Sequence, residues 1–184
     1  MAIILILFGL LISFVTVIIF LILLVRIIIS FIKKKPFPKK LLIAMLVGIG
    51  VVTSIYVYEV YFFTFADIDR EYIQNGPDPV LSPTGEFTAN AYFEPYGGAV
   101  GGVNMWVEIT KHNDNDNIKI IYYSDANDNI LLDWVDEKTL FITNAGPYKS
   151  NSIKLDVGHE IYHDRGLACR SWFMKDEYET CYRK

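Results

Sequence analysis

Residues 2–25 read AIILILFGLLISFVTVIIFLILLV, a stretch with no charged side chain and only Ser13 and Thr16 as polar ones. A helix needs about 20 apolar residues to cross the hydrocarbon core of a bilayer, so this stretch predicts a transmembrane helix. The apolar sequence continues after Arg26, whose long side chain can reach the membrane interface while its stem stays among lipid. We therefore expect the first helix to span about residues 3–32.

A cleaved signal peptide is the competing interpretation of the same stretch. It would have positive charges before a shorter apolar core and small residues at the cleavage site. Here the basic residues follow the apolar run and none precedes it. We therefore expect a helix that stays in the mature chain.

A second apolar run starts at Leu41 and predicts a second helix over about residues 41–63. Gly48 and Gly50 lie in its middle, where small residues either let two helices touch or simply face lipid. Aromatic residues gather at its far end and predict an interfacial belt: Tyr56, Tyr58, Tyr61, Phe62, Phe63 and Phe65.

The loop between the two runs, residues 33–40, contains five lysines. Short loops rich in lysine and arginine stay in the cytoplasm. Residues 1–65 are then a transmembrane hairpin of a cell-membrane protein with two spans and both termini outside the cytoplasm.

Charge divides the chain in the same way. Residues 1–65 carry six basic side chains and one acidic one, a net charge of +5, whereas residues 66–184 carry 11 basic and 20 acidic ones, a net charge of −9. Nucleic-acid binding needs a basic face, so we expect no nucleic-acid partner. The expected partners are the lipid bilayer and another membrane or cell-surface protein.

Residues 66–79 contain turn-forming residues and predict a connector. From residue 80 onward the apolar period changes to two, which is typical of half-buried strands. Residues 80–184 then form an extracytoplasmic β-domain with a C-terminal tail and a short helix around residues 172–178. About six strands are predicted, at residues 87–93, 103–110, 118–123, 130–135, 139–143 and 152–157.

The predicted fold class is therefore α+β by segment. A two-helix transmembrane hairpin precedes a small antiparallel β-domain, which is a meander, a sandwich or a partial barrel.

Three motifs in the predicted β-domain resemble those of a known protein family. They are Ser82-Pro83-Thr84-Gly85, Gly97-Gly98-Ala99 and Asp133-Trp134-Val135-Asp136. Over residues 81–164 the chain resembles an uncharacterised family of small membrane-anchored proteins of Bacillus-type bacteria. The first and last motifs are also similar to one blade of a TolB-type β-propeller; one blade cannot close a ring, so this supports only an antiparallel meander. The resemblance implies a fold and an anchor and brings no catalytic residues.

One stretch, His159-Glu160-Ile161-Tyr162-His163, matches the zinc-binding pattern H-E-x-x-H. On a helix its two imidazoles share a face and can hold Zn²⁺ while the glutamate polarises a water. Here the stretch follows a predicted strand and lies between Gly158 and Gly166, without an apolar helical stripe. In the family that the chain resembles, these histidines fall in a variable turn. We therefore favour surface histidines and predict no metal, cofactor or catalytic residue, with His159, Glu160 and His163 as the zinc candidates.

Four aspartates in polar loops, Asp114, Asp116, Asp125 and Asp128, raise the question of calcium. An EF-hand loop needs a central glycine and a glutamate at its twelfth position. Neither is present, so turn formation is the better account of these residues.

The sequence contains two cysteines, Cys169 and Cys181. Outside the cytoplasm they can form a disulfide. Two free thiols, or a bond to another chain, stay open as alternatives because pairing depends on geometry.

Three functions follow from these features. The first is a non-enzymatic binding module, anchored in the membrane and facing outward, of unknown ligand. The second is a zinc-dependent hydrolase using His159, Glu160 and His163. The third is a structural accessory subunit whose transmembrane hairpin is the interface.

Overall fold

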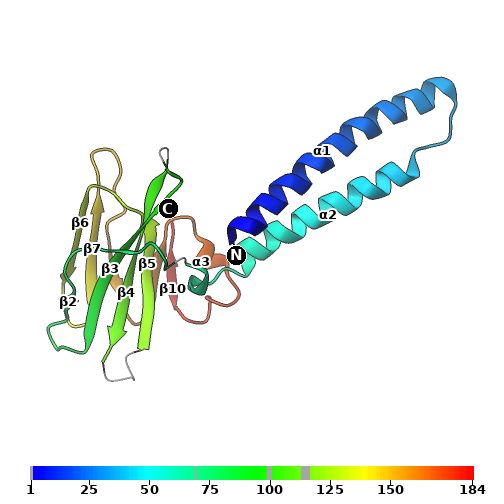
Figure 1. The fold of residues 1–184 in the computed structure, drawn as a ribbon. Helices are drawn as coiled ribbons and strands as arrows, with labels where there is room; N and C mark the ends of the chain where they lie inside the picture. The colour runs from blue at the N-terminus through cyan, green and yellow to red at the C-terminus, as the bar shows by residue number, and fades with distance from the viewer. Residues whose placement is uncertain (1, 69, 99–100, 113–116) are drawn as a thin grey trace. The chain divides into compact units, whose positions relative to one another are not determined.

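The computed structural model describes residues 2–68, 70–98, 101–112 and 117–184. The chain divides into two compact units, one ending at Phe62 and one from Phe63 to Lys184. The first holds two long apolar helices and the second a mostly antiparallel β-domain, as Figure 1 shows. The predicted α+β class is confirmed.

The two helices are α1 (Ala2–Lys33) and α2 (Lys39–Tyr61). Both are long and apolar enough to cross a membrane. Lys34, with a φ of 47°, ends α1, and Pro36 and Pro38 then keep the connecting loop out of helical geometry.

Helix α2 ends at Tyr61, two residues before the predicted end at residue 63. Phe62 caps it by donating its backbone N–H to the Tyr58 carbonyl. Phe63 belongs to the second unit, where its carbonyl oxygen accepts a hydrogen bond from Ser171 Oγ at 2.6 Å. A tertiary contact therefore sets this helix end.

Gly48 is a point of close approach between the two helices, one of the two roles that its residue type suggested. A Cβ atom there would lie 2.3 Å from Oγ1 and 3.2 Å from Cβ of Thr16 on α1. Thr16 Oγ1 also donates to the Ile12 carbonyl at 2.8 Å, which fixes its rotamer. A Cβ added at Gly50 would meet nothing within 4 Å. Gly48 therefore brings the helices together, and Gly50 does not.

We expect Gly48→Ala to weaken the packing of α1 on α2 by about 1–3 kcal/mol, the usual cost of overpacking a tight contact. A rotation of Thr16 cannot relieve the clash, because Thr16 Cβ is itself too close. The measurement is a titration of the full-length protein from mild-detergent micelles into SDS, followed by helical circular dichroism. Gly50→Ala is the matched control; equal shifts for the two variants would contradict the assignment.

The β-domain contains two sheets. The larger sheet has the order β1 (Gln74–Asn75), β3 (Phe87–Tyr96), β4 (Gly102–Lys111), β5 (Asn117–Asp125), β9 (Glu160–His163) and β10 (Thr180–Tyr182), with β2 (Val80–Leu81) paired to β3. The smaller sheet has the order β6 (Asn129–Trp134), β7 (Thr139–Ala145) and β8 (Ile153–Asp156). Strands β5 and β9, and β9 and β10, pair in parallel, and the other pairs are antiparallel.

The six predicted strands correspond to β3 to β8. Strands β1 and β2 lie where a connector and a strand start were expected, and β9 and β10 lie in the predicted turn and tail. These four have two to four residues each, too few for a visible alternation. The predicted helix around residues 172–178 is wrong: the helix is α3 (Leu167–Arg170), and turns follow it.

The first core lies between the two sheets (Figure 1). Alternate residues of the long strands point into it, such as Met105, Val107 and Ile109 of β4. Leu140 and Ile142 of β7 meet them from the smaller sheet. This is the core that the period of two predicted.

The opposite face of the larger sheet is buried as well. Trp106 of β4, Ile120 of β5 and Ile161 of β9 belong to a second core. No further sheet covers them in the described residues. Their cover comes from the two segments that flank the β-domain in the chain, and this second core positions the candidate site.

Candidate binding cleft

One cover of the second core is residues 63–73, the juxtamembrane segment, which directly follows α2. Phe63, Phe65, Ile68 and Ile73 pack into the core around a short 3₁₀ helix, η1 (Phe65–Asp67). Burying aromatic and aliphatic groups of this size contributes roughly 1.5–3 kcal/mol per fully buried side chain. The segment is therefore a folded part of the β-domain, unlike the simple connector that its turn residues predicted.

Two residues of the predicted aromatic belt belong to the folded β-domain. Phe65 is buried in the second core, and Phe63 packs against the same core. Burial on the β-domain explains these two aromatics without lipid.

An ion pair fixes the end of the juxtamembrane segment. Arg70 Nη2 lies 2.7 Å from Oε1 of Glu108, a buried residue of β4. The same oxygen accepts a hydrogen bond from Trp106 Nε1 at 3.1 Å. A buried carboxylate needs such partners, so Arg70 and Glu108 stabilise the segment in one position.

His163 closes the second core beside Phe63 and Phe65. Its ring stacks on Tyr123 at a centroid distance of 5.0 Å and meets Phe63 edge-on at 5.1 Å. Burial lowers its pKa to about 4; the Asp164 carboxylate, with Oδ1 3.9 Å from Nδ1, raises it, and Arg165 lowers it further. His163 is therefore a neutral, buried aromatic residue at pH 7.

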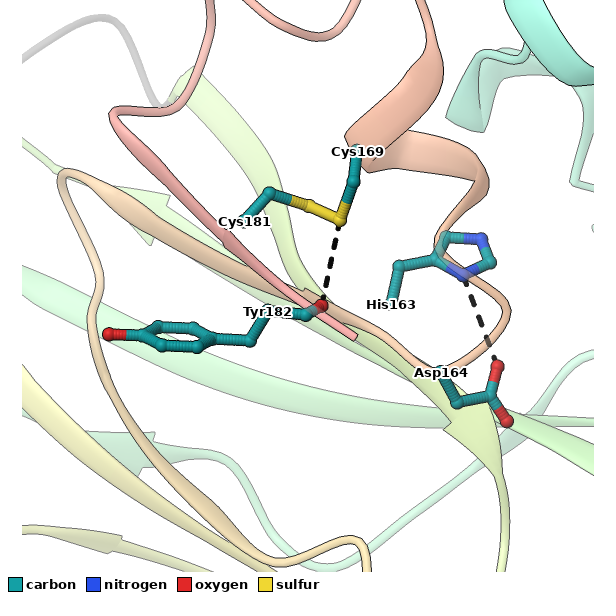
Figure 2. The surroundings of a disulfide bond; sticks show 5 residues. All are labelled: His163, Asp164, Cys169, Cys181 and Tyr182. Atoms are coloured by element: carbon teal, nitrogen blue, oxygen red, sulfur yellow. Dashed lines mark hydrogen bonds and ion pairs between the residues drawn. A yellow bond between two sulfur atoms is a disulfide. The ribbon is translucent and has the colours of Figure 1, made fainter. Parts of the chain in front are cut away.

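The other cover of the second core is residues 167–184, the C-terminal tail. Figure 2 shows the disulfide between Cys169, in α3, and Cys181, in β10, with their Cα atoms 5.4 Å apart. Strand β10 runs parallel to β9, with Cys181 opposite Ile161. The disulfide thus ties the start of the tail to the sheet edge and closes a loop that returns over the core.

Two hydrogen-bonding groups hold that loop to β5. The Tyr178 hydroxyl donates to the Ile120 carbonyl. Lys119 Nζ donates to the carbonyls of Gly158 at 2.9 Å and Glu177 at 2.8 Å, and lies 4.0 Å from the centre of the Tyr178 ring. Burial lowers the pKa of Lys119, although the carboxylates of Glu177 and Asp156 act in the opposite direction.

A cleft of about 700 Å³ opens where the juxtamembrane segment, β5 and the tail meet. It is lined by residues 64–66 and Arg70, by residues 117–120, and by Phe173, Met174, Glu177 and Tyr178. Its two cations, Arg70 and Lys119, already have internal partners. The cleft has the size of typical ligand sites, and polar and apolar side chains line it in about equal numbers.

One wall of the cleft is a strand edge. Strand β5 pairs with β4 along its length, but β9 pairs only with Tyr122 and Tyr123 of β5 in the described residues. The first half of β5, which begins with Asn117 and Ile118, therefore borders the cleft without a neighbouring strand on that side, although the Ile120 carbonyl already accepts the Tyr178 hydroxyl. Such an edge can accept an extended chain.

The zinc candidates do not converge. His159 lies in the turn before β9 and pairs with Glu179 at 2.9 Å, whereas His163 is buried at the end of β9. Glu160 Oε2 accepts from the Asp156 backbone N–H, and its Oε1 accepts from the Tyr182 hydroxyl. Four residues of extended chain span about 13 Å, compared with about 6 Å for four residues of helix, so the two imidazoles lie too far apart to bind one ion.

Of the acidic loop residues, Asp125 pairs with two basic side chains. Asp125 Oδ2 lies 3.5 Å from Lys149 Nζ, and its Oδ1 lies 3.5 Å from Arg165 Nη2. Asp114 and Asp116 lie outside the described residues. Among the residues that are described, no three His, Cys, Asp or Glu side chains gather in a group that could hold a metal ion.

The sequence did not reveal the cleft. Its walls come from residues about 50 positions apart in the chain, and several of them occupy stretches that read as connector or tail. One signal was available: apolar side chains continue beyond the predicted second helix, among them Phe65, Ile68 and Ile73.

Comparison with known families matches residues 37–166 to the model of a family of unknown function, DUF5412. The match covers more than half of the chain. The chain belongs to the DUF5412 family. The matched residues begin in the loop before α2 and end at Gly166, so the DUF5412 region includes the juxtamembrane segment and nine of the strands. The disulfide and β10 lie beyond it. No curated protein and no solved structure matches the chain.

Proposed function

We propose that this DUF5412 protein is a non-enzymatic binding module, anchored by its helical hairpin, whose β-domain faces outward and binds an extended segment of another membrane or cell-surface protein. The cleft beside the open edge of β5 is the observation that carries this proposal. Strand addition provides affinity through main-chain hydrogen bonds, and the apolar side chains of the walls, such as Phe65 and Ile118, provide contacts for alternate side chains.

Two features support the outward orientation. Five lysines in the loop between the helices favour a cytoplasmic loop, which puts both termini on the other side. The Cys169–Cys181 disulfide fits an oxidising compartment. The resemblance noted from the sequence supports the cell membrane of a Bacillus-type bacterium.

The two native cysteines allow a direct test of orientation. We expect a membrane-impermeant maleimide to leave intact cells unlabelled and to label both cysteines after an impermeant reductant is added. Labelling that requires lysis of the reduced cells would place the β-domain in the cytoplasm and overturn the proposal.

Site-specific photo-crosslinking in intact cells tests the binding surface. A photoreactive amino acid at Ile118, which is 56% exposed in the cleft, should give a discrete crosslinked product. The same group at Leu131, which is 51% exposed on β6 of the smaller sheet, is the matched control and should give none. Equal products at both positions, or none at Ile118, would count against the cleft as the binding site.

A further inference from the structure

We propose that the β-domain has a second membrane contact of its own: the start of the C-terminal tail, residues 170–175, lies in the lipid headgroup layer, with Trp172 and Phe173 inserted toward the acyl chains. The inference rests on the membrane anchoring proposed above. It adds to that anchor a lipid-facing surface of the folded domain.

Chain connectivity places this stretch close to the end of a membrane span. Phe63 follows Tyr61, the last residue of α2, by two residues, or at most about 7 Å of extended chain. The interfacial layer of a bilayer is about 5–8 Å thick on each side of its hydrocarbon core. The hydrogen bond from Ser171 Oγ to the Phe63 carbonyl then holds Ser171 within or beside that layer, although 108 positions separate the two residues.

The residues next to Ser171 have the composition of a membrane interface. Trp172 is 57% exposed and Phe173 is 59% exposed, large values for aromatic side chains of a folded domain. Arg170 and Lys175 flank them, both exposed, and residues 170–175 contain no acidic side chain in a domain of net charge −9. Aromatic rings favour the headgroup level, and the basic side chains can reach lipid phosphates.

The fold fixes which side of the stretch faces outward. Met174 is buried in the second core, whereas Trp172 and Phe173 are exposed, and Phe173 also forms part of the rim of the cleft. The Phe173 backbone N–H donates to Ser171 Oγ, and the Cys169–Cys181 disulfide closes the loop around the stretch. A preorganised loop loses little conformational entropy on insertion, and this favours binding to the interface.

Tryptophan fluorescence tests the proposal, because the sequence has three tryptophans and none lies in the hairpin. The full-length protein is reconstituted into phosphatidylcholine vesicles with and without acyl chains brominated near the headgroup. We expect the brominated lipid to quench part of the emission, and Trp172→Phe to remove nearly all of that quenchable part. Trp134→Phe, on the smaller sheet, should leave it unchanged.

Quenching by aqueous iodide measures whether the same tryptophan is accessible from water. If Trp172 faces water, iodide will quench its emission and brominated lipid will not; if it faces a protein partner, neither will quench it. Either result overturns the inference. Flotation of the vesicles separates this result from a failure of the anchor: protein that floats without lipid quenching contradicts the second contact alone. Protein that does not float contradicts the membrane anchoring and, with it, this inference.

Discussion

Replacing both Cys169 and Cys181 with serine is expected to lower the free energy of unfolding of the β-domain by about 3 kcal/mol. The disulfide closes a loop of 12 residues, and restricting a loop of that size in the unfolded chain accounts for this amount. The part of the domain that loses structure first should be the second core. Strand β10 has three residues at the edge of the sheet, and the tail above it depends on the disulfide for its position.

Urea unfolding of the full-length protein in detergent micelles, followed by tryptophan fluorescence, measures this effect. Oxidised wild type, reduced wild type and the double serine variant are compared under the same conditions. Reduced wild type and the variant should unfold together, at lower urea than the oxidised protein. An unchanged midpoint in both would show that the tail stays in place without the disulfide.

Acid should destabilise the wild-type β-domain through His163. Its folded-state pKa, about 4, is lower than the value of about 6.5 in an unfolded chain, so the unfolded state takes up the proton first. The contribution of His163 to stability is therefore unchanged above about pH 6.5 and is lost progressively as the pH falls toward 4. At pH 4.5 the loss relative to pH 7 is about 2–3 kcal/mol.

Comparison with His163→Phe isolates this effect, since the carboxylates that also titrate in this range are common to both proteins. Phenylalanine keeps an aromatic ring against Phe63, Phe65 and Tyr123 and has no nitrogen to protonate. We expect the variant to match wild type at pH 7 within about 1 kcal/mol and to lose less stability at pH 4.5. His163→Leu is a second variant in case the larger ring does not fit.

His159→Gln is the matched control for the acid experiment, because His159 is exposed and pairs with Glu179 at the surface. It should keep the full acid sensitivity of the wild type. If the stability of His163→Phe and His163→Leu falls with pH as steeply as that of wild type, His163 is not the group responsible.

Much of the fold could be predicted from local patterns. Strands β3 to β8 show an apolar period of two, and their turns contain the expected asparagine, aspartate and glycine residues. Strand β4 shows where the pattern stops being informative. Its face with Met105, Val107 and Ile109 was expected to be buried, but Trp106 and Glu108 on the other face are buried too. What covers that second face lies far away in the sequence.

The candidate site was predicted less well, for the same reason. The H-E-x-x-H pattern allowed a shared zinc site for His159, Glu160 and His163, but both histidines were expected at the surface. That expectation is wrong for His163, which is buried, because the pattern does not fix the backbone that carries the side chains. In the structure the backbone is a turn and a strand, so one histidine is exposed and the other is buried. The only local signal of the cleft was the run of apolar side chains that continues through residues 63–73.

The sequence alone determined the two apolar helices and the antiparallel strands. Both depend on periodicities that neighbouring residues carry, and the length of an apolar run is visible without any knowledge of contacts. The tertiary structure alone decided that residues 63–73 and the C-terminal tail fold over one face of the sheet. Their contacts, such as the hydrogen bond from Ser171 to Phe63 and the ion pair of Arg70 with Glu108, join residues 108 and 38 positions apart. Contacts at such separations leave no periodicity in the neighbouring sequence, so they become visible only in the folded chain.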